Sequence, residues 1–175
     1  MQDSAASFDS TFFRTALGRF ATGVTLITAR DRAGAPLGMT VSSFNSVSLS
    51  PPLVLWSLSL ASSSYAAFND CESYVIAVLA ADQLDLAIRF ARGTREERFR
   101  DLPLTTAPGG TLMLDLPCAS WFECRHHARH PAGDHVIMVG EVVNCEHAAL
   151  PPLVFHAGGF DLTPVPDTIA GASSP

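Results

Sequence analysis

The chain has 175 residues, which suits a single domain with one buried core. Apolar residues make up 47% of it and charged residues only 16%, so we expect part of the surface to be covered in an oligomer, with a homodimer as the simplest form. The net charge of −6 and the lack of a basic run argue against nucleic acid as a partner.

The N-terminal residues 1–9 are short and polar and lack the basic-then-apolar order of a secretion signal. No apolar run reaches the roughly 18 residues that a membrane span requires. We therefore expect a cytoplasmic protein without membrane association. The cysteines show no C-x-x-C spacing, which predicts reduced, buried thiols and neither a zinc site nor disulfides; they are Cys71, Cys118, Cys124 and Cys145.

The first predicted elements are a helix and a hairpin. Residues 9–20 place phenylalanine and leucine at helical spacing behind Asp9 or Ser10 as N-cap, which predicts an amphipathic helix. Residues 23–29 and 36–43 are β-like and are separated by a polar, glycine-containing stretch. This pattern predicts an antiparallel pair of strands.

The middle of the chain alternates strands and short helices. After two prolines, residues 53–58 form an apolar run that predicts a buried strand. Three serines precede a short predicted helix at residues 65–68, and residues 74–79 are again strand-like. Residues 82–90, with Asp82 as an acidic N-cap, predict another helix.

The second half is mostly β. The charged residues 95–100 are expected to form a solvated loop. Strands are predicted at residues 120–124 and 136–143, with turn chemistry at residues 131–134 between them, and a last short strand at 153–155.

Many short strands with only three helices predict a mainly β protein, a closed antiparallel barrel with peripheral helices. The predicted organisation is one domain over residues 10–163. Flexible segments are expected on both sides, at residues 1–9 and in the Pro-, Ala- and Ser-rich tail 164–175.

Several familiar catalytic motifs are missing from the sequence. It has no G-x-G-x-x-G, no G-x-x-x-x-G-K-[ST], no G-x-S-x-G and no H-E-x-x-H. Histidines crowd residues 126–135, but the adjacent His126 and His127 would point to opposite faces of a strand and cannot share one site. We therefore expect no metal site.

Three stretches are candidates for binding a ligand, and each has a simpler interpretation. Residues 38–44 put a glycine and small hydroxyls at a strand end, where they could also be the polar face of a half-exposed strand. Residues 62–64 offer serine hydroxyls at a helix start, for ordinary N-capping or for a phosphate. Gly133-Asp134-His135 is either a hairpin turn or places a histidine at a pocket rim.

Taken together, these stretches resemble the short-chain flavin reductases, FMN-binding split-barrel enzymes that supply reduced flavin to two-component monooxygenases. The resemblance extends over about residues 10–162. It is carried, in order, by RTALGRFATG at 14–23, GMTVSSF at 38–44, SVSL at 46–49, PPLV at 51–54, RFA at 89–91, GDH at 133–135 and GEV at 140–142.

The resemblance implies a Greek-key split β-barrel homodimer with the flavin, FMN or FAD, near the dimer interface. It implies NADH or NADPH as reductant, with NADH favoured, and delivery of reduced flavin to a separate monooxygenase. It assigns His135 to positioning the nicotinamide. By the same resemblance the cofactor-binding residues are Met39, Thr40, Val41, Ser42, Ser43, Phe44, Ser57, Leu58, Ser62, Ser63, Ser64, Phe90, Ala91, Gly133, Asp134, His156 and Phe160.

The family's aromatic-His-x-Gly-x-aromatic pattern is kept by Phe155, His156, Gly158 and Phe160. Ala157 and Gly159 are small where the family commonly carries bulkier or basic residues, so no side-chain contact is expected from those two.

Hydride transfer between a nicotinamide and a flavin uses the reactivity of the cofactors, so the lack of an obvious nucleophile or acid–base pair fits this interpretation. Two alternatives stay open. The chain could keep its flavin bound throughout turnover and act on another substrate, or it could be a non-catalytic flavin carrier.

Overall fold

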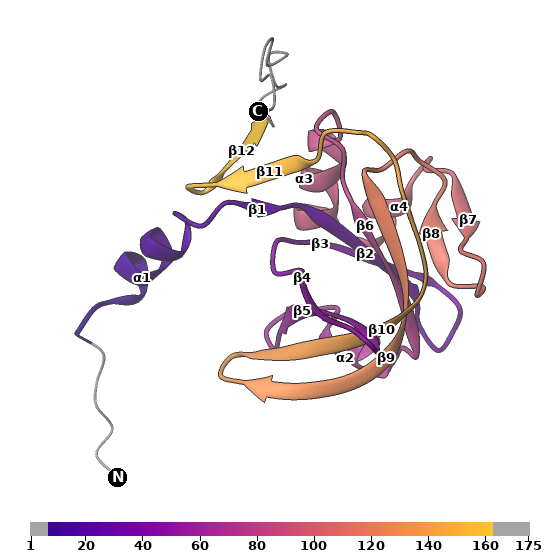
Figure 1. Cartoon of the computed structure of the whole chain (residues 1–175), viewed down its shortest axis with the longest axis horizontal. Coiled ribbons are helices and arrows are strands. Elements are labelled where there is room, and N and C mark those ends of the chain that lie inside the picture. The colour runs from indigo at the N-terminus through magenta and orange to yellow at the C-terminus, as the bar shows by residue number, and fades with distance from the viewer. Residues whose placement is uncertain (1–6, 163–175) are drawn as a thin grey trace, which may run out of the picture.

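The main body of the protein is one curved antiparallel sheet. The computed structural model describes residues 7–162; the first six residues and the tail from 163, where flexible ends were expected, lie outside that range. Seven strands curl into a barrel (Figure 1) in the spatial order β3 (Pro36–Val41), β2 (Thr25–Arg30), β6 (Ser73–Val78), β9 (Ser120–Ala132), β10 (His135–His147), β5 (Pro52–Ser59) and β4 (Asn45–Leu49).

Strands β3 and β4 are the two edges of this sheet and do not pair with each other, so the barrel stays open between them. Neighbours such as β2 and β3 are joined by hairpins, whereas β6 follows β5 in the chain but lies beside β2 and β9. This mixture of hairpins and long returns confirms the predicted mainly β, Greek-key split barrel. The expectation of a closed barrel was wrong, because β3 and β4 do not pair.

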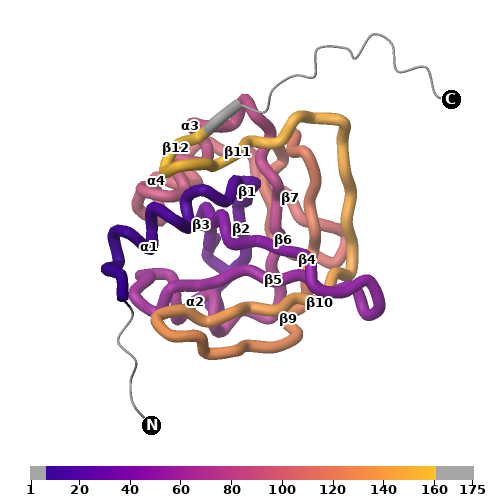
Figure 2. The backbone as a smooth tube through the Cα atoms, turned by 60° about the vertical axis from the view of Figure 1, so that its left-hand side comes forward, coloured from indigo at the N-terminus to yellow at the C-terminus, as the bar shows by residue number. Residues whose placement is uncertain are grey.

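Two small sheets and four helices surround the barrel in the described residues. One sheet joins β1 (Thr22–Gly23), β11 (Leu153–His156) and β12 (Gly159–Leu162), and the other joins β7 (Leu104–Thr106) and β8 (Leu112–Leu114). Figure 2 shows the first of these sheets on one side of the opening and β5, β9 and β10 on the other. The helices are α1 (Ser10–Leu17), α2 (Tyr65–Asp70), α3 (Leu84–Arg92) and α4 (Arg95–Phe99).

Two hydrophobic clusters form the core. The larger one centres on Trp56, which meets Phe68 and Tyr74 edge-to-face at ring-centroid distances of 5.5 and 5.7 Å. The second lies between the sheet and α3 and contains Leu26, Leu79 and Phe90. Trp56, Phe68 and Tyr74 are all fully buried. Full burial of a side chain such as Phe68 contributes about 1.5–3 kcal/mol of stability through the area removed from water.

The predicted N-terminal helix is present as α1, capped by Asp9, whose carboxylate accepts a hydrogen bond from the Phe12 amide at 2.7 Å. Its apolar face, however, is not covered by the described part of the barrel; Phe12 and Phe13 contact the preceding Phe8 at ring-centroid distances of 6.5 and 5.3 Å. The helix extends away from the barrel (Figure 1) and has no buried residue. Phe12, Leu17 and the following Phe20 are 67%, 58% and 74% exposed.

The loop prediction for residues 95–100 was wrong, because most of this stretch forms helix α4. Thr94 caps the helix by accepting from the Glu97 amide at 3.3 Å, while the Glu97 carboxylate accepts from the Thr94 amide at 2.8 Å. This reciprocal pair is a capping box, a T-x-x-E pattern readable in the sequence. The N-cap of α3 also differs from the prediction: it is Gln83 and not Asp82.

The β9–β10 hairpin is longer than expected. Strand β9 continues to Ala132, and Pro131 pairs with Val136, so the turn consists of Gly133 and Asp134 alone. Gly133 has a φ of +63°, the left-handed conformation that glycine adopts without strain. Strands β4, β7, β8 and β12 were not predicted.

The four cysteines are free thiols, as expected, but only two of them are buried. Cys71 and Cys124 lie in the core, Cys118 is partly exposed and Cys145 is exposed on β10. The prediction of burial was therefore wrong for Cys145, which sits on the part of β10 beyond the barrel core.

Candidate functional site

The segment Met39–Phe44 lies at the open side of the barrel. Strand β3 ends at Val41, and the chain then crosses to β4 at the opposite edge of the sheet. Val41 is buried and Ser42 is exposed, while the other four residues are partly buried. This crossing brings backbone and hydroxyl groups to the surface next to both unpaired edges.

Two hydroxyls of this segment are engaged in holding its shape. The Thr40 hydroxyl donates to the Ala87 carbonyl at 2.7 Å. The Ser43 hydroxyl accepts from the Ser57 amide at 2.9 Å and donates to the Ser57 carbonyl at 3.3 Å, which ties the segment to β5. Within the described residues the exposed Ser42 hydroxyl has no such partner and is available to a ligand.

An apolar groove of about 110 Å³ lies beside this segment. Phe155 and Phe160, from β11 and β12, form one wall and contact each other at a centroid distance of 5.2 Å. The full lining is Val24, Thr40, Val41, Ser42, Phe155 and Phe160. His156 does not line the groove and lies in the same hairpin, opposite Gly159.

The Gly133–His135 turn reaches the same region through β5. His135 pairs with Ser59 and Ile137 pairs with Ser57, and residues that face each other in a sheet project from the same face. Ser57 and Ser59 are two residues apart, about 7 Å along the strand, and Ser43 and His135 flank this stretch of β5 from opposite sides. The structure thus links Ser43 and His135 through one short stretch of β5.

His135 is oriented by its neighbour. Its Nδ1 lies 2.7 Å from the Asp134 carboxylate, and the side chain is 42% exposed. The hydrogen bond and the charge of His135 hold the pKa of the Asp134 carboxyl below its usual range. When Nδ1 donates to the carboxylate, Nε2 is left free to bond a ligand group such as a carboxamide.

The serines at residues 62–64 adjoin this turn, because the Leu60 amide donates to the Asp134 carbonyl at 3.0 Å. Ser62 accepts from the Ser64 amide at 3.2 Å, and Ser63 is exposed. Ser64 occupies the N-cap position of α2 without a side-chain cap bond. Since α2 has only six residues, anion binding here would depend on the hydroxyls and amides more than on the helix dipole.

Two expected cofactor-binding residues have fully buried side chains. Leu58 points into the larger core cluster and Phe90 into the second one, and both are 0% exposed. Phe90 packs under β3, so in this arrangement its side chain offers no surface to a ligand. Ala91, next to it, is exposed.

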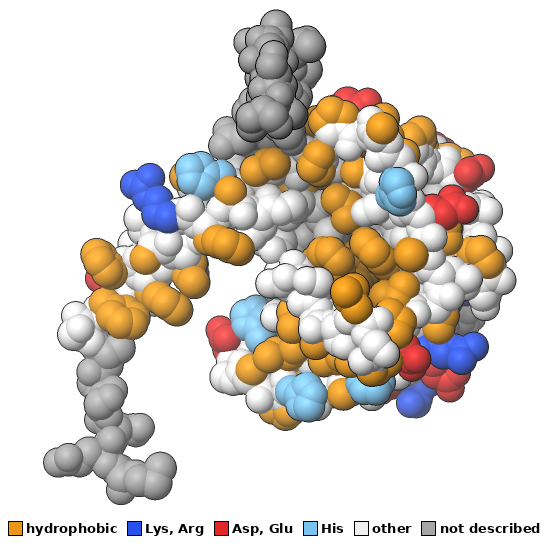
Figure 3. Space-filling view, viewed as in Figure 1, with side chains coloured by type: hydrophobic (Ala, Val, Ile, Leu, Met, Phe, Trp, Pro, Cys, Tyr) orange, Lys and Arg blue, Asp and Glu red, His pale blue; other side chains and the backbone are white. Residues whose placement is uncertain are grey.

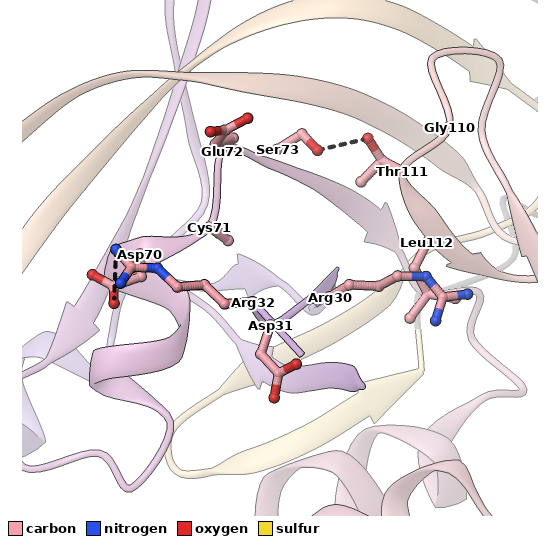
Figure 4. A pocket seen from close by; sticks show the side chains of 10 residues that line it. All are labelled: Arg30, Asp31, Arg32, Asp70, Cys71, Glu72, Ser73, Gly110, Thr111 and Leu112. Atoms are coloured by element: carbon pink, nitrogen blue, oxygen red, sulfur yellow. Dashed lines mark hydrogen bonds and ion pairs between the residues drawn. The ribbon is translucent and has the colours of Figure 1, made fainter. Parts of the chain in front are cut away.

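A pocket of about 390 Å³ lies elsewhere (Figure 4). It is at the far end of the β2–β3 hairpin, beside α2 and the β7–β8 turn. None of the expected site residues lines it, and its two arginines are matched by three carboxylates, so it has no net preference for anions. Its lining is Arg30, Asp31, Arg32, Asp70, Cys71, Glu72, Ser73, Gly110, Thr111 and Leu112.

Sequence reasoning did not single out Phe122 or Ala87. Phe122 stacks on Phe44 at a centroid distance of 5.5 Å, and Ala87 accepts the Thr40 hydroxyl. Neither had a recognisable signal, because one is an ordinary apolar strand residue and the other acts through its backbone. Across residues 7–162, no three His, Cys, Asp or Glu side chains are grouped as metal ligands, and no described helix has the length and apolarity to span a membrane.

Comparisons with known proteins show which family this chain is similar to. Residues 17–163 match the model of the flavin reductase like domain. The FMN reductase (NADH) SmoA of Agrobacterium fabrum is 48% identical over 152 residues, which cover 87% of this chain and 85% of that protein.

Two further matches differ in coverage. The reductase component of the flavin-dependent trigonelline monooxygenase of Acinetobacter baylyi is 37% identical over 84% of this chain, which spans about half (47%) of that relative. The NADH:FAD oxidoreductase SgcE6 of Streptomyces globisporus, solved with NAD and FAD fragments, superposes with a TM-score of 0.84 at 30% identity, covering 95% of this chain and 99% of that one.

Proposed function

We infer that this chain, which belongs to the flavin reductase like domain family, uses a nicotinamide cofactor, NADH in preference to NADPH, to reduce FMN or FAD. The observation that carries this proposal is that one short stretch of β5 bonds Ser43 at Ser57 and pairs with His135 at Ser59, beside the exposed Ser42. It joins the segment expected to hold a flavin with the histidine expected to hold a nicotinamide.

The residues present fit a flavin. Ser42 and Ser63 offer exposed hydroxyls for a ribityl chain or phosphate, and the groove beside Thr40 offers apolar and aromatic surface for a ring edge. When bound, the flavin supplies the hydride-accepting chemistry. The chain's own task is to orient the two ring systems, and orientation of this kind can contribute about 7 kcal/mol or more to lowering a barrier. We assign His135 to orienting the nicotinamide carboxamide.

We propose that the site is completed by a second copy of the chain in a homodimer. The groove of about 110 Å³ is well below the roughly 300–1,000 Å³ of usual cofactor pockets. Next to it, Phe12 and Leu17 of α1 and the following Phe20 are exposed, and Figure 3 shows hydrophobic side chains gathered on the segment that extends from the barrel. Leu49, on the free edge of β4, is 97% exposed. Covering these surfaces with a second copy would also enlarge the groove.

The biological role that we propose is delivery of reduced flavin to a separate monooxygenase in the cytoplasm. The name of the Acinetobacter relative, a reductase component of such a system, supports it. Among the serines expected to hold the flavin, Ser42 and Ser63 are exposed in the single chain, which suits a flavin that is released after reduction.

The test follows absorbance at 340 nm with purified protein and NADH or NADPH, adding FMN, FAD, riboflavin or no flavin. We expect nicotinamide oxidation that depends on added flavin. Oxidation without added flavin by a protein that purifies yellow would favour a permanently bound flavin with another substrate. Flavin binding without any oxidation would favour a carrier.

A further inference from the structure

Strand β3, which leads into the segment Met39–Phe44, is an edge strand, so its outward carbonyls have no neighbouring strand to pair with. Arg98 of α4 takes the place of that strand at Gly38. Its Nη1 donates to the Gly38 carbonyl at 2.7 Å, and its Nε donates to the Gly93 carbonyl at 2.8 Å. The side chain is partly buried, which lowers the pKa of the guanidinium, although arginine keeps its charge in proteins.

The same residue of β3 is held on its other side by two rings. A Cβ added at Gly38 would lie 2.5 Å from Phe90 Cε1 and 2.8 Å from Phe99 Cζ, so the strand rests directly on these rings. Phe90 and Phe99 themselves meet edge-to-face at 5.1 Å. Two residues further on, Thr40 bonds the Ala87 carbonyl of α3. Contacts from helices α3 and α4 therefore fix the position of β3 where it leads into the candidate site.

We propose that Arg98 is a positioning residue for flavin binding. It fixes the backbone of β3 at Gly38 and thereby holds Met39–Phe44 in the conformation that receives the flavin. This inference rests on the proposed function. It also gives the RFA motif a role that does not need contact with the cofactor: Phe90 supports the strand on which the flavin segment is built.

Neighbouring arginines provide a comparison. Arg95 bonds the carbonyls of Ala35 and Pro36 and pairs with Asp31, at the end of β3 remote from the site. Among the described residues the Arg100 guanidinium pairs with the exposed Glu96, at 3.5 Å, and makes no hydrogen bond to β3. Arg100→Met is therefore a matched control that removes one charge from the same region without loosening the strand.

The experiment compares wild type, Arg98→Met, Arg98→Lys and Arg100→Met by three measurements. Amide hydrogen exchange of the peptide 37–44, without flavin, reports the order of the segment directly. Fluorescence titration gives the Kd for FMN and FAD, and NADH oxidation gives KM and kcat. We expect Arg98→Met to speed exchange and to raise Kd and KM for flavin roughly tenfold, as for loss of a charged hydrogen bond, with KM for NADH unchanged. Arg98→Lys should recover part of the loss, and Arg100→Met should match wild type.

The outcomes separate the two proposals. Unchanged exchange and flavin Kd in Arg98→Met would overturn the role of Arg98, as would a fall in kcat alone, since a smaller folded fraction lowers kcat without altering KM. A wild type that binds flavin but oxidises no nicotinamide would refute the reductase function, and exchange and Kd would still decide the role of Arg98. A wild type that binds no flavin would overturn both.

Discussion

At the scale of single residues, His135 is the side chain whose proposed role is most directly testable. It is partly exposed, its Nδ1 is held by Asp134, and it shares a face with Ser57. We expect His135→Ala to raise KM for NADH roughly tenfold, the effect of losing one hydrogen bond or ring contact, and to change the Kd for flavin much less. Steady-state kinetics and flavin titration measure the two effects separately, and equal losses in both would refute the assignment.

Gly140 tests the packing of the larger core cluster. A Cβ at this position would lie 2.3 Å from the Tyr74 hydroxyl and 2.9 Å from Cys124 Cβ. Since the surrounding side chains are fully buried, Gly140→Ala should lower the free energy of unfolding by about 1–3 kcal/mol. Gly23→Ala is the control, because nothing lies within 4 Å of a Cβ there. Denaturant unfolding of both variants checks the prediction, and equal stability would contradict it.

At the scale of elements, the turn between β7 and β8 is fastened to the barrel by one carboxylate. Glu123 on β9 is buried and accepts from the Gly109 and Thr111 amides at 2.8 and 3.1 Å and from the Asn144 side chain at 2.7 Å. Burial alone would raise the pKa of this carboxyl, but the hydrogen bonds from Thr111, Asn144 and Gly109 outweigh it and lower the pKa.

A carboxyl whose pKa is lower in the folded state contributes stability above its unfolded pKa, and this contribution is lost as pH falls through the folded value. Glu123→Gln should therefore lower the free energy of unfolding by about 1–3 kcal/mol at pH 7, because the NH₂ group of the glutamine would face hydrogen-bond donors and could not accept from them. The difference from wild type should shrink below about pH 4. Thermal unfolding of wild type and Glu123→Gln between pH 7 and pH 3 measures this difference in stability. A difference independent of pH would contradict this account.

Whether an element of the fold could be predicted from the sequence depended on how clearly its residue pattern marked that element. The β2–β3 hairpin, β5 and β6 followed from alternation and turn residues, because each lies within a short, clearly bounded run. Helix α4 was missed although its capping box was readable, because its charged residues suggested a loop. The extension of β9 beyond Cys124 could not be seen, because its polar residues have no alternation and are ordered only by pairing with β10.

The site was predicted unevenly for similar reasons. The segment 38–44 and the turn at 133–135 were found through family resemblance, and their proximity through β5 needed the strand register. The buried position of Phe90 could not be inferred, because the RFA motif identifies the residue type at each position and not the direction of its side chain. The hydrogen bond from Arg98 to Gly38 joins residues sixty positions apart and left no local signal.

At the scale of the whole molecule, the proposed dimer makes a prediction for α1. An isolated helix of eight residues is too short to be stable in water, so α1 needs a surface to pack against. We expect the double substitution Phe12→Glu and Leu17→Glu to shift the protein from dimer to monomer and to weaken flavin binding. Sedimentation velocity and flavin titration measure these effects. Ile88→Glu, on an exposed position of α3, is the control. A wild type that sediments as a monomer would refute the dimer.

The α4 arginines that bond the edge of β3, Arg95 and Arg98, also bear on aggregation. An exposed strand edge is a template on which another polypeptide can add a strand, and this barrel has two such edges. On β3 the carbonyls of Pro36 and Gly38 are already occupied by arginine side chains. Strand β4 has no comparable cover among the described residues and carries the exposed Val47 and Leu49. A monomeric variant would therefore be expected to aggregate through β4, and charged residues introduced on that strand should keep it in solution.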